Sequence, residues 1–437
     1  MPRRLHRRAL ALLLPVVASP LVTDAATRPA FVANYDEAAV PRYTLPDPLV
    51  LNSGTPVRDA ATWQSRRRPE VLELFAREMY GRTPAGRPDK MHWAVTSVDR
   101  HALGGKAVRK EVTVWFTEKK DGPKMHLLIY QPAGAAGTRW PTFLGLNFYG
   151  NQSVNADPGI TLSRSWMRTN PDYKIENNRA TEGTRGAHAS RWNVEDVIAR
   201  GYATATIYYG DLCEDRPEGL TRDVGALFGT GAVNERKPDE WGSIGIWAWG
   251  LSRAVDYLAS DPEIDSKRIA VHGHSRLGKA ALWAGAQDER FALVISNNSG
   301  CGGAALSRRR YGETVARINN SFPHWFSLRF RAYNEREDTL PFDQHALIAL
   351  IAPSPVHVAS AEGDKWADPR GEFLAAKNAE PVYALFGKRG MEVSEWPAVN
   401  QPVIGDGLAY HMRTGKHDIT AYDWARYLDH ADRVLRK

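Results

Sequence analysis

The sequence predicts an α/β protein in which helices cover both faces of a mixed, mostly parallel β-sheet. The 437 residues are 43% hydrophobic and 24% charged, which is a globular rather than a disordered composition. Strand patterns of antiparallel type come first, and strands then alternate with helices from about residue 200 onward. This order is typical of a three-layer αβα sandwich, and no linker interrupts it, so we expect one domain.

The N-terminus has the pattern of a secretory signal peptide. Four arginines lie between residues 3 and 8, an apolar stretch covers residues 9–22, and small residues follow at Ala25 and Ala26. A basic start, a short apolar core and a small-residue exit predict a signal peptide at residues 1–25 and a secreted or periplasmic protein. A retained membrane anchor and a core helix are the alternatives. No later apolar run reaches the ~20 residues that a membrane span needs.

The net charge of +7 would favour an anionic partner such as nucleic acid, but the leader accounts for part of it. Cleavage after Ala25 removes four arginines and one aspartate, which leaves a charge of +4. We therefore expect no nucleic-acid partner, and no membrane association after cleavage. Cys213 and Cys301 are too few for a disulfide scaffold or a cysteine-based zinc ribbon. One disulfide between them and two free thiols both remain open.

We expect residues 26–437 to form the single mature domain. Its first part is predicted to contain an extension, one helix and three strands. Residues 26–60 show little periodicity, so we expect an N-terminal extension that wraps the domain. Residues 63–81 place apolar side chains at helical spacing, which predicts a surface helix. Strands are predicted at 110–118, 125–132 and 141–150.

The second half of the chain alternates strands with helices. Strands are predicted at 202–209, 268–273, 291–298, 355–361 and 408–414. Helices are predicted at 241–260, 276–288, about 371–380 and about 420–435. The segment near 302–350 is rich in arginine and aromatic residues, and we expect a cap-like insertion at the C-terminal edge of the sheet.

A nucleophilic serine is predicted at Ser275, where the strand 268–273 turns into a helix that begins at Arg276. A serine on such a sharp turn projects its hydroxyl above the sheet, and the N–H of the next residue faces the developing oxyanion. Leu277 departs from the usual G-x-S-x-G pattern, and Gly278 comes one residue late. An ordinary strand-to-helix turn is the alternative. The buried strand before it and the alanine-rich helix after it favour a nucleophile elbow and the α/β-hydrolase fold.

The partners of Ser275 follow from the chain order of α/β-hydrolases, which is serine, acid and then histidine. Asp364 follows the strand 355–361, and His417 follows the last strand. We expect His417 to accept the Ser275 proton and the carboxylate of Asp364 to hold the imidazole in the required tautomer.

Three residues near these positions compete for the same roles. Asp368 precedes a proline and is expected to cap the following helix. Asp418 adjoins His417 and is expected to point away from it or to cap a helix. His411 lies within the last strand, where a packed or surface histidine is more common than a catalytic one.

Residues 273–309, 340–373 and 415–419 together resemble bacterial glucuronoyl esterases, carbohydrate esterase family fifteen. The Ser-Arg-x-Gly-Lys core and the D-x-W-A-D-P loop are the specific parts, and the resemblance extends from about Thr142 to the C-terminus. It implies a secreted serine esterase of α/β-hydrolase fold that needs neither metal nor cofactor. The implied substrates are lignin-carbohydrate esters, in which 4-O-methyl-glucuronic acid of plant cell-wall glucuronoxylan is joined to lignin alcohols. We also expect a monomer.

The resemblance implies roles for the residues around the turn. Ser275 matches the nucleophile of the family and His417 its base. Arg276 matches an arginine whose side chain, with its backbone N–H, completes the oxyanion hole, and a charge-assisted donor is well suited to that task. Fungal members carry a catalytic glutamate where this chain has Asn298. Asp364 must then supply the anionic partner of His417, and if it does not face His417 a Ser–His dyad has to be considered.

The resemblance also assigns sugar contacts to Lys279, Glu313 and Trp366. From the residues alone, Lys279 reads as a solvated helix residue, Glu313 as a surface charge and Trp366 as core packing. Two other functions remain open. One is an acetylxylan or cinnamoyl esterase with the same triad, because only the pocket decides the substrate. The other is an inactive carbohydrate-binding relative.

Overall fold

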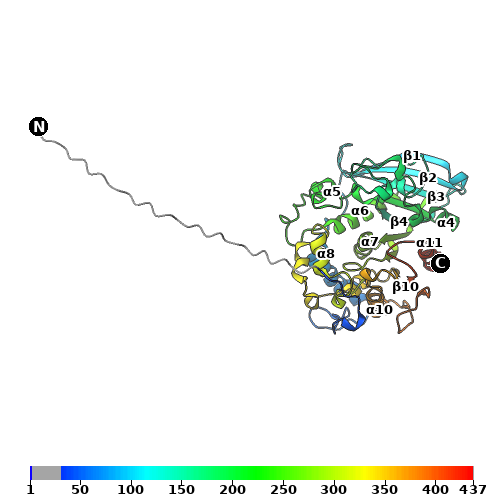
Figure 1. Ribbon diagram of the computed structural model, residues 1–437. Helices are drawn as coiled ribbons and strands as arrows, with labels where there is room; N and C mark the ends of the chain where they lie inside the picture. Colours follow the sequence, from blue (N-terminus) through cyan, green and yellow to red (C-terminus); the bar gives the residue numbers. More distant parts are fainter. Residues whose placement is uncertain (2–30, 437) are drawn as a thin grey trace. The chain divides into compact units, whose positions relative to one another are not determined.

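A ten-stranded β-sheet runs through the part of the chain from Ala33 onward (Figure 1). The computed structural model describes Met1 and residues 31–436. The predicted signal peptide, residues 1–25, therefore lies outside the described residues apart from Met1. Among the described residues, no helix combines the length and the apolar character that crossing a membrane requires.

The sheet is mixed and mostly parallel, as predicted. Its strand order is β1-β2-β3-β5-β4-β6-β7-β8-β10-β9. The pairs β1–β2, β2–β3, β3–β5 and β10–β9 are antiparallel, and the other pairs are parallel. The strands are β1 His92–Ala102, β2 Ala107–Trp115, β3 Lys124–Pro132, β4 Trp140–Asn147, β5 Ala203–Tyr208, β6 Ile264–His274, β7 Phe291–Asn297, β8 Val356–Ala361, β9 Val403–Ile404 and β10 Leu408–Arg413.

Helices cover both faces of this sheet, which makes three layers. The helices are α1 Ala60–Thr62, α2 Arg68–Phe75, α3 Ala189–Trp192, α4 Val194–Ala199, α5 Asp223–Leu227, α6 Ser243–Leu258, α7 Arg276–Gln287, α8 Val315–Ser321, α9 Gln344–Ala349, α10 Pro369–Leu385 and α11 Ala421–Leu435. Helices α6, α7, α9 and α10 share a core with one face of the sheet, and α4 and α11 share a core with the other. Successive side chains of a strand point to opposite faces, so Phe143 of β4 joins the second core and Leu144 the first.

Strand β1 was not predicted from the sequence, because its side chains do not alternate between buried apolar and exposed polar positions. It lies at the edge of the sheet, and Val95 and Val98 are both exposed. A register shift between Val95 and Ser97 further breaks the alternation of a regular strand. An edge strand of this kind carries little of the periodicity from which strands are recognised.

The segment 302–350 contains α8, which is labelled in Figure 1, and α9. Short helical turns lie between these two helices. The N-terminal extension contacts this segment through Glu37, which pairs with Arg309 at 2.6 Å. Glu37 also pairs with Arg370 of α10 at 3.1 Å. Cys213 and Cys301 are both buried and free, so the disulfide alternative is wrong.

Candidate active site

Ser275 occupies a strained turn between β6 and α7. Its φ of 57° lies in the left-handed region that side chains seldom adopt, and its N–H donates to the Asn297 carbonyl at 2.9 Å. Gly273 is required here because a Cβ at that position would lie 2.0 Å from the Leu277 carbonyl oxygen. A Cβ at Gly278 would lie 3.0 Å from the Gly273 carbonyl oxygen. The close approach that needs a small residue therefore falls at position 278, which leaves Leu277 free to enter the core.

His417 and Asp364 form a hydrogen-bonded pair next to this turn. Nδ1 of His417 lies 2.5 Å from Oδ2 of Asp364, and Nδ2 of Asn298 donates to the same oxygen at 2.7 Å. Asp364 is buried, whereas the His417 side chain is 42% exposed. Ser275 and His417 line one cavity of about 250 Å³. The three loops that follow β7, β8 and β10 thus bring an amide, a carboxylate and an imidazole together at the serine.

The loop that carries His417 is held by the buried side chain of Arg413. Its guanidinium donates to the carbonyls of Thr414 at 3.0 Å, Lys416 at 3.0 Å and Asp418 at 2.5 Å. Asp423 at the start of α11 accepts from Arg413 Nε at 2.7 Å, which compensates the buried charge. The backbone on both sides of His417 is therefore fixed by one arginine.

A second histidine lies against the ring of His417 and stays neutral. The ring centroids of His274 and His417 are 4.4 Å apart. Burial lowers the pKa of His274, and the proximity of His417 lowers it further. Nδ1 of His274 lies 2.6 Å from Oδ1 of Asn297, whose Nδ2 donates to Asp423 and Tyr427, so we assign the proton to Nδ1. A neutral His274 adds no charge that would oppose protonation of His417.

Arg276 extends its guanidinium over the cavity and is held by Asp215. The guanidinium donates to Oδ2 of Asp215, and Oδ1 accepts from His324 Nε2 at 2.9 Å and from Trp325 Nε1 at 2.8 Å. Burial alone would raise the pKa of Asp215, but Arg276 and these hydrogen bonds lower it well below its ordinary value. The carboxylate in turn raises the pKa of Arg276 despite the burial that opposes this.

An aromatic surface also supports Arg276. The guanidinium carbon lies 4.8 Å from the ring centroid of Trp325 and 5.4 Å from that of Phe322, whose rings stack on each other at 3.7 Å. The cation is thus fixed by rings as well as by a carboxylate. Its planar donors are therefore held in a fixed orientation at the cavity.

Lys279, Glu313 and Trp366 interact with one another, and Lys279 and Glu313 also interact electrostatically with Arg276. None of the three lines the cavity that contains Ser275. Lys279 is buried, and its ammonium donates to the Ser299 carbonyl and, at 2.7 Å, to the Cys301 carbonyl. Burial lowers the pKa of Lys279, while Glu313 opposes this. Burial raises the pKa of Glu313, and Lys279, Arg276 and a hydrogen bond from the Trp366 side chain oppose this. The reading of Lys279 as a solvated residue is wrong.

The competing residues have other partners. Asp368 caps α10 by accepting from the Gly371 N–H at 2.9 Å and pairs with Arg309 at 2.8 Å. Asp418 pairs with Arg191 at 2.6 Å. His411 is fully buried in β10, where Nε2 lies 3.0 Å from Asp423. Among the described residues, the side chain of His417 hydrogen-bonds to Asp364 and to none of the three competitors. Neither the competitors nor Asp364 line the cavity that contains Ser275.

The residues that orient the site escaped the sequence-based reasoning. Asp215, His324, Trp325 and Arg413 belong to no motif and lie up to about two hundred positions apart in the chain. Only Asp215 carried a signal, because it follows the predicted strand 202–209 at the edge where catalytic loops gather. Within residues 31–436, no group of three or more His, Cys, Asp or Glu side chains is arranged to hold a metal ion.

A serine on a strained turn, a histidine–aspartate pair and a fixed guanidinium around one cavity suit acyl transfer. Together with the three-layer sheet they define the class as carboxylic ester hydrolases of α/β-hydrolase fold. Comparison with known proteins places the chain more narrowly. The family described as glucuronyl esterase, fungi, matches residues 225–387.

Two relatives cover nearly the whole chain. Carbohydrate esterase MZ0003 of an unknown prokaryotic organism is 52% identical over 399 residues, covering 91% of each chain. The 4-O-methyl-glucuronoyl methylesterase of Phanerochaete carnosa is 28% identical over 394 residues, covering 86% of this chain and 81% of its own.

Solved structures agree with these relatives. A promiscuous CE15 esterase from a marine bacterial metagenome superposes with a TM-score of 0.86 at 52% identity, covering 92% of this chain and all of its own. A glucuronoyl esterase from Solibacter usitatus superposes with a TM-score of 0.84 at 50% identity, covering 90% of this chain and 99% of its own. The chain belongs to carbohydrate esterase family 15, the glucuronoyl esterases.

Proposed function

We propose that this esterase hydrolyses the ester between 4-O-methyl-glucuronic acid of glucuronoxylan and an alcohol, including lignin alcohols, through an acyl-enzyme on Ser275. The observation that carries the proposal is the 2.5 Å pair of His417 and Asp364 at the cavity that also contains Ser275. The name glucuronoyl esterase, given to a structure that is 50% identical over nearly its full length, supports the choice of acyl group.

Acylation begins when His417 takes the proton of the Ser275 hydroxyl and the oxygen attacks the ester carbonyl carbon. The resulting oxyanion accepts hydrogen bonds from the Arg276 guanidinium and the backbone N–H of the same residue. Collapse of this tetrahedral intermediate breaks the bond to the alcohol, which leaves with the proton from His417. Water then repeats the sequence on the acyl-enzyme and releases the free uronic acid and Ser275.

Asp364 acts on the imidazolium that forms in each step. Its carboxylate accepts from Nδ1 of His417, which leaves Nε2 as the nitrogen that exchanges protons with the reacting groups. Asn298 donates to the same carboxylate oxygen and fixes its position. The amide cannot provide the negative charge that the fungal glutamate would have supplied, so the charge comes from Asp364.

The sugar ring of the acyl group binds at Lys279, Glu313 and Trp366. An ammonium has three donors, and the Ser299 and Cys301 carbonyls take two of those of Lys279. One donor is left for a sugar hydroxyl. Glu313 offers acceptors beside it, and the electrostatic attraction between the two side chains keeps them close. Orientation of the acyl group by several fixed polar groups is what a specific hydrolase needs.

An esterase with broader preference is the second candidate, because the 52% identical structure is described as promiscuous. Hydrolysis by the wild type and Ser275→Ala should be compared on benzyl glucuronate, methyl glucuronate, acetylated xylan and methyl ferulate. Activity confined to the glucuronate esters and lost in the variant supports the first proposal. Release of acetate or ferulate favours the broader esterase, and silence on all four substrates favours an inactive carbohydrate-binding relative.

We propose further that residues 1–25 are removed on export and that the mature enzyme is a monomer. The basic start and apolar core of the leader support export. N-terminal sequencing of the exported protein and its mass in solution by light scattering test the two statements. An intact N-terminus, or a mass of twice the chain, would contradict them.

A further inference from the structure

The catalytic cavity leaves most of a polysaccharide substrate outside it. Its volume of about 250 Å³ is below the ~300–1,000 Å³ of sites that enclose a drug-sized ligand, and each further sugar adds a unit of similar size to the acyl group. Two other cavities, of about 270 and 590 Å³, open in the same part of the molecule. Neither contains any residue of the proposed triad.

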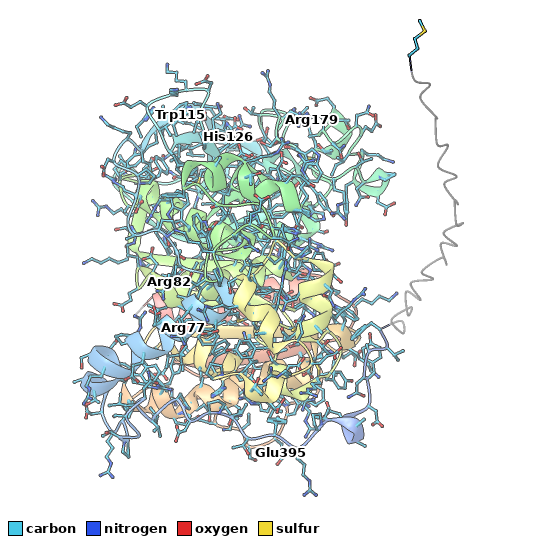
Figure 2. All side chains as sticks on the ribbon, turned by 90° about the vertical axis from the view of Figure 1, so that its left-hand side faces the viewer. Arg77, Arg82, Trp115, His126, Arg179 and Glu395 are labelled. Atoms are coloured by element: carbon cyan, nitrogen blue, oxygen red, sulfur yellow. The ribbon has the colours of Figure 1, made fainter. Side chains whose placement is uncertain are left out.

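Both cavities lie at the edge of the sheet that carries Ser275. Strand β3 is antiparallel to β5, and Leu127 near its start pairs with Ile207 near the end of β5. The start of β3, with His126, therefore lies at the C-terminal end of the parallel strands, where the nucleophile turn also lies. Figure 2 shows His126 and Arg179 at the same end of the molecule, away from Arg77 and Arg82.

The three cavities follow one another along this edge. The two outer cavities adjoin each other, since both are lined by Lys124, His126, Arg164, Ser165 and Asp211. The smaller of the two outer cavities is also lined by Gly210 and Glu214. Their neighbours in the chain, Tyr209 and Asp215, line the catalytic cavity. The segment 209–215 therefore borders both the catalytic cavity and the smaller outer cavity.

The shared part of the two outer cavities contains polar groups in fixed positions. Buried Asp211 accepts from the His126 backbone N–H at 3.1 Å and from Ser165 Oγ at 2.6 Å, and its Oδ2 lies 3.1 Å from His126 Nδ1. The His126 side chain is nevertheless 47% exposed. Within the described residues no hydrogen bond uses its Nε2, which is therefore available to a ligand.

The walls of the outer cavities add hydroxyls and an aromatic ring. In the larger cavity, buried Glu111 accepts from the Thr161 N–H at 2.8 Å and from its hydroxyl at 2.9 Å. In the smaller cavity, the half-buried Trp166 has the Arg216 guanidinium 4.4 Å from its ring centroid. Fixed polar groups together with an aromatic ring suit a chain of rings that carry hydroxyls.

We propose that these two cavities, here called the β3 groove, bind main-chain sugar units of the polysaccharide next to the esterified uronic acid. The inference rests on the proposed function for the acyl group but concerns a separate surface. The β3 groove would raise the affinity for polymeric esters and leave the chemistry on small esters unchanged, because none of its side chains reaches the reacting atoms.

His126→Ala and Trp166→Ala test the β3 groove, with His101→Ala and Trp396→Ala as matched controls at exposed positions outside it. The ratio of kcat/KM on a glucuronoxylan-linked ester to kcat/KM on methyl glucuronate should fall about tenfold in the groove variants. It should stay within twofold in the controls. Affinity electrophoresis in unesterified glucuronoxylan provides a second measurement that needs no turnover, and retardation should be lost only in the groove variants.

An unchanged ratio together with equal migration of all five proteins would overturn the β3 groove. Two groove variants on different segments, each checked by its melting temperature, separate loss of binding from loss of folding. If the wild type cleaves no glucuronate ester but is retarded through His126 and Trp166, the groove stands and the proposed function fails. If small glucuronate esters are cleaved normally and the polymer confers no advantage in any protein, the groove alone fails.

Discussion

Replacement of Asp364 by asparagine removes one charge from the proposed triad and little else. Oδ2 of Asp364 accepts from both Asn298 and His417, so the carbonyl oxygen of the introduced amide is expected to take the Oδ2 position. The tautomer of His417 would then survive, and the loss should be smaller than the ~10⁴-fold seen where the tautomer becomes wrong. The expected loss comes from the missing attraction to the imidazolium.

The magnitude follows from the geometry of the pair. Opposite charges ~4 Å apart near a protein surface attract by about 4 kcal/mol. The His417 side chain is 42% exposed, so solvent weakens this attraction, and we expect a loss of about 3 kcal/mol in the transition state. Since ~1.4 kcal/mol is a factor of ten, kcat should fall about 10²-fold with KM little changed.

Asp368→Asn is the matched control on the same loop. Asp368 pairs with buried Arg309, so its replacement leaves a buried charge without its partner and should lower the free energy of unfolding by about 3 kcal/mol. The introduced asparagine can still cap α10. Its kcat should stay within twofold of the wild type. Steady-state kinetics on benzyl glucuronate and denaturant unfolding measure the two effects. Equal losses of kcat in the two variants, or normal turnover in Asp364→Asn, would refute the assignment of the acid.

Three further predictions concern groups around the triad. Asp215→Asn should lower kcat about tenfold, because Arg276 loses the carboxylate that holds it. In an Arg276→Ala background the same replacement should cause no further loss of kcat. Additive losses in this double-mutant cycle would show that Asp215 does not act through Arg276. Asn298→Ala removes the 2.7 Å donor to the carboxylate of Asp364 and should lower kcat about tenfold at unchanged KM, whereas normal kinetics would show the donor to be dispensable. Burial raises the pKa of Glu372 from 4.5 to about 8, so the unfolded chain ionises first as pH rises and wild-type stability falls between about pH 4.5 and 8. Glu372→Gln should remove most of this decline, on the order of 4 kcal/mol, in urea unfolding at pH 5 and pH 8, and equal slopes for both proteins would exclude it.

Much of the sheet could be predicted because its strands are buried on both faces. The buried second half of β6 and the whole of β8 are short runs of the kind expected for strands covered on both faces. The predicted bounds of β8 differ from the observed ones by one residue, whereas β6 begins at Ile264, four residues before its predicted start. Helix α7 follows β6 directly, so the turn at Ser275 could be placed as well. Strand β1 could not be found, because an edge strand with exposed valines has no periodic apolar face.

The site also has a part that could be predicted from the sequence and a part that could not. Ser275, Asp364 and His417 each follow a predicted strand, and parallel strands place such positions at one edge of the sheet. The sequence cannot show that Asn298 donates to Asp364, because that bond depends on the conformation of two separate loops. It also offered no reason to connect Arg413 with the carbonyls around His417.

The sequence by itself determined the layered sheet, the serine turn and the order of the proposed catalytic residues, because these depend on local periodicity and on chain order. Only the tertiary structure decided which groups orient the site. Asp215 meets His324 and Trp325 across more than one hundred residues, and a buried carboxylate is stable only where such donors converge on it. These donors converge because loops that are distant in the sequence pack together, so no sequence motif or residue spacing predicts the contact.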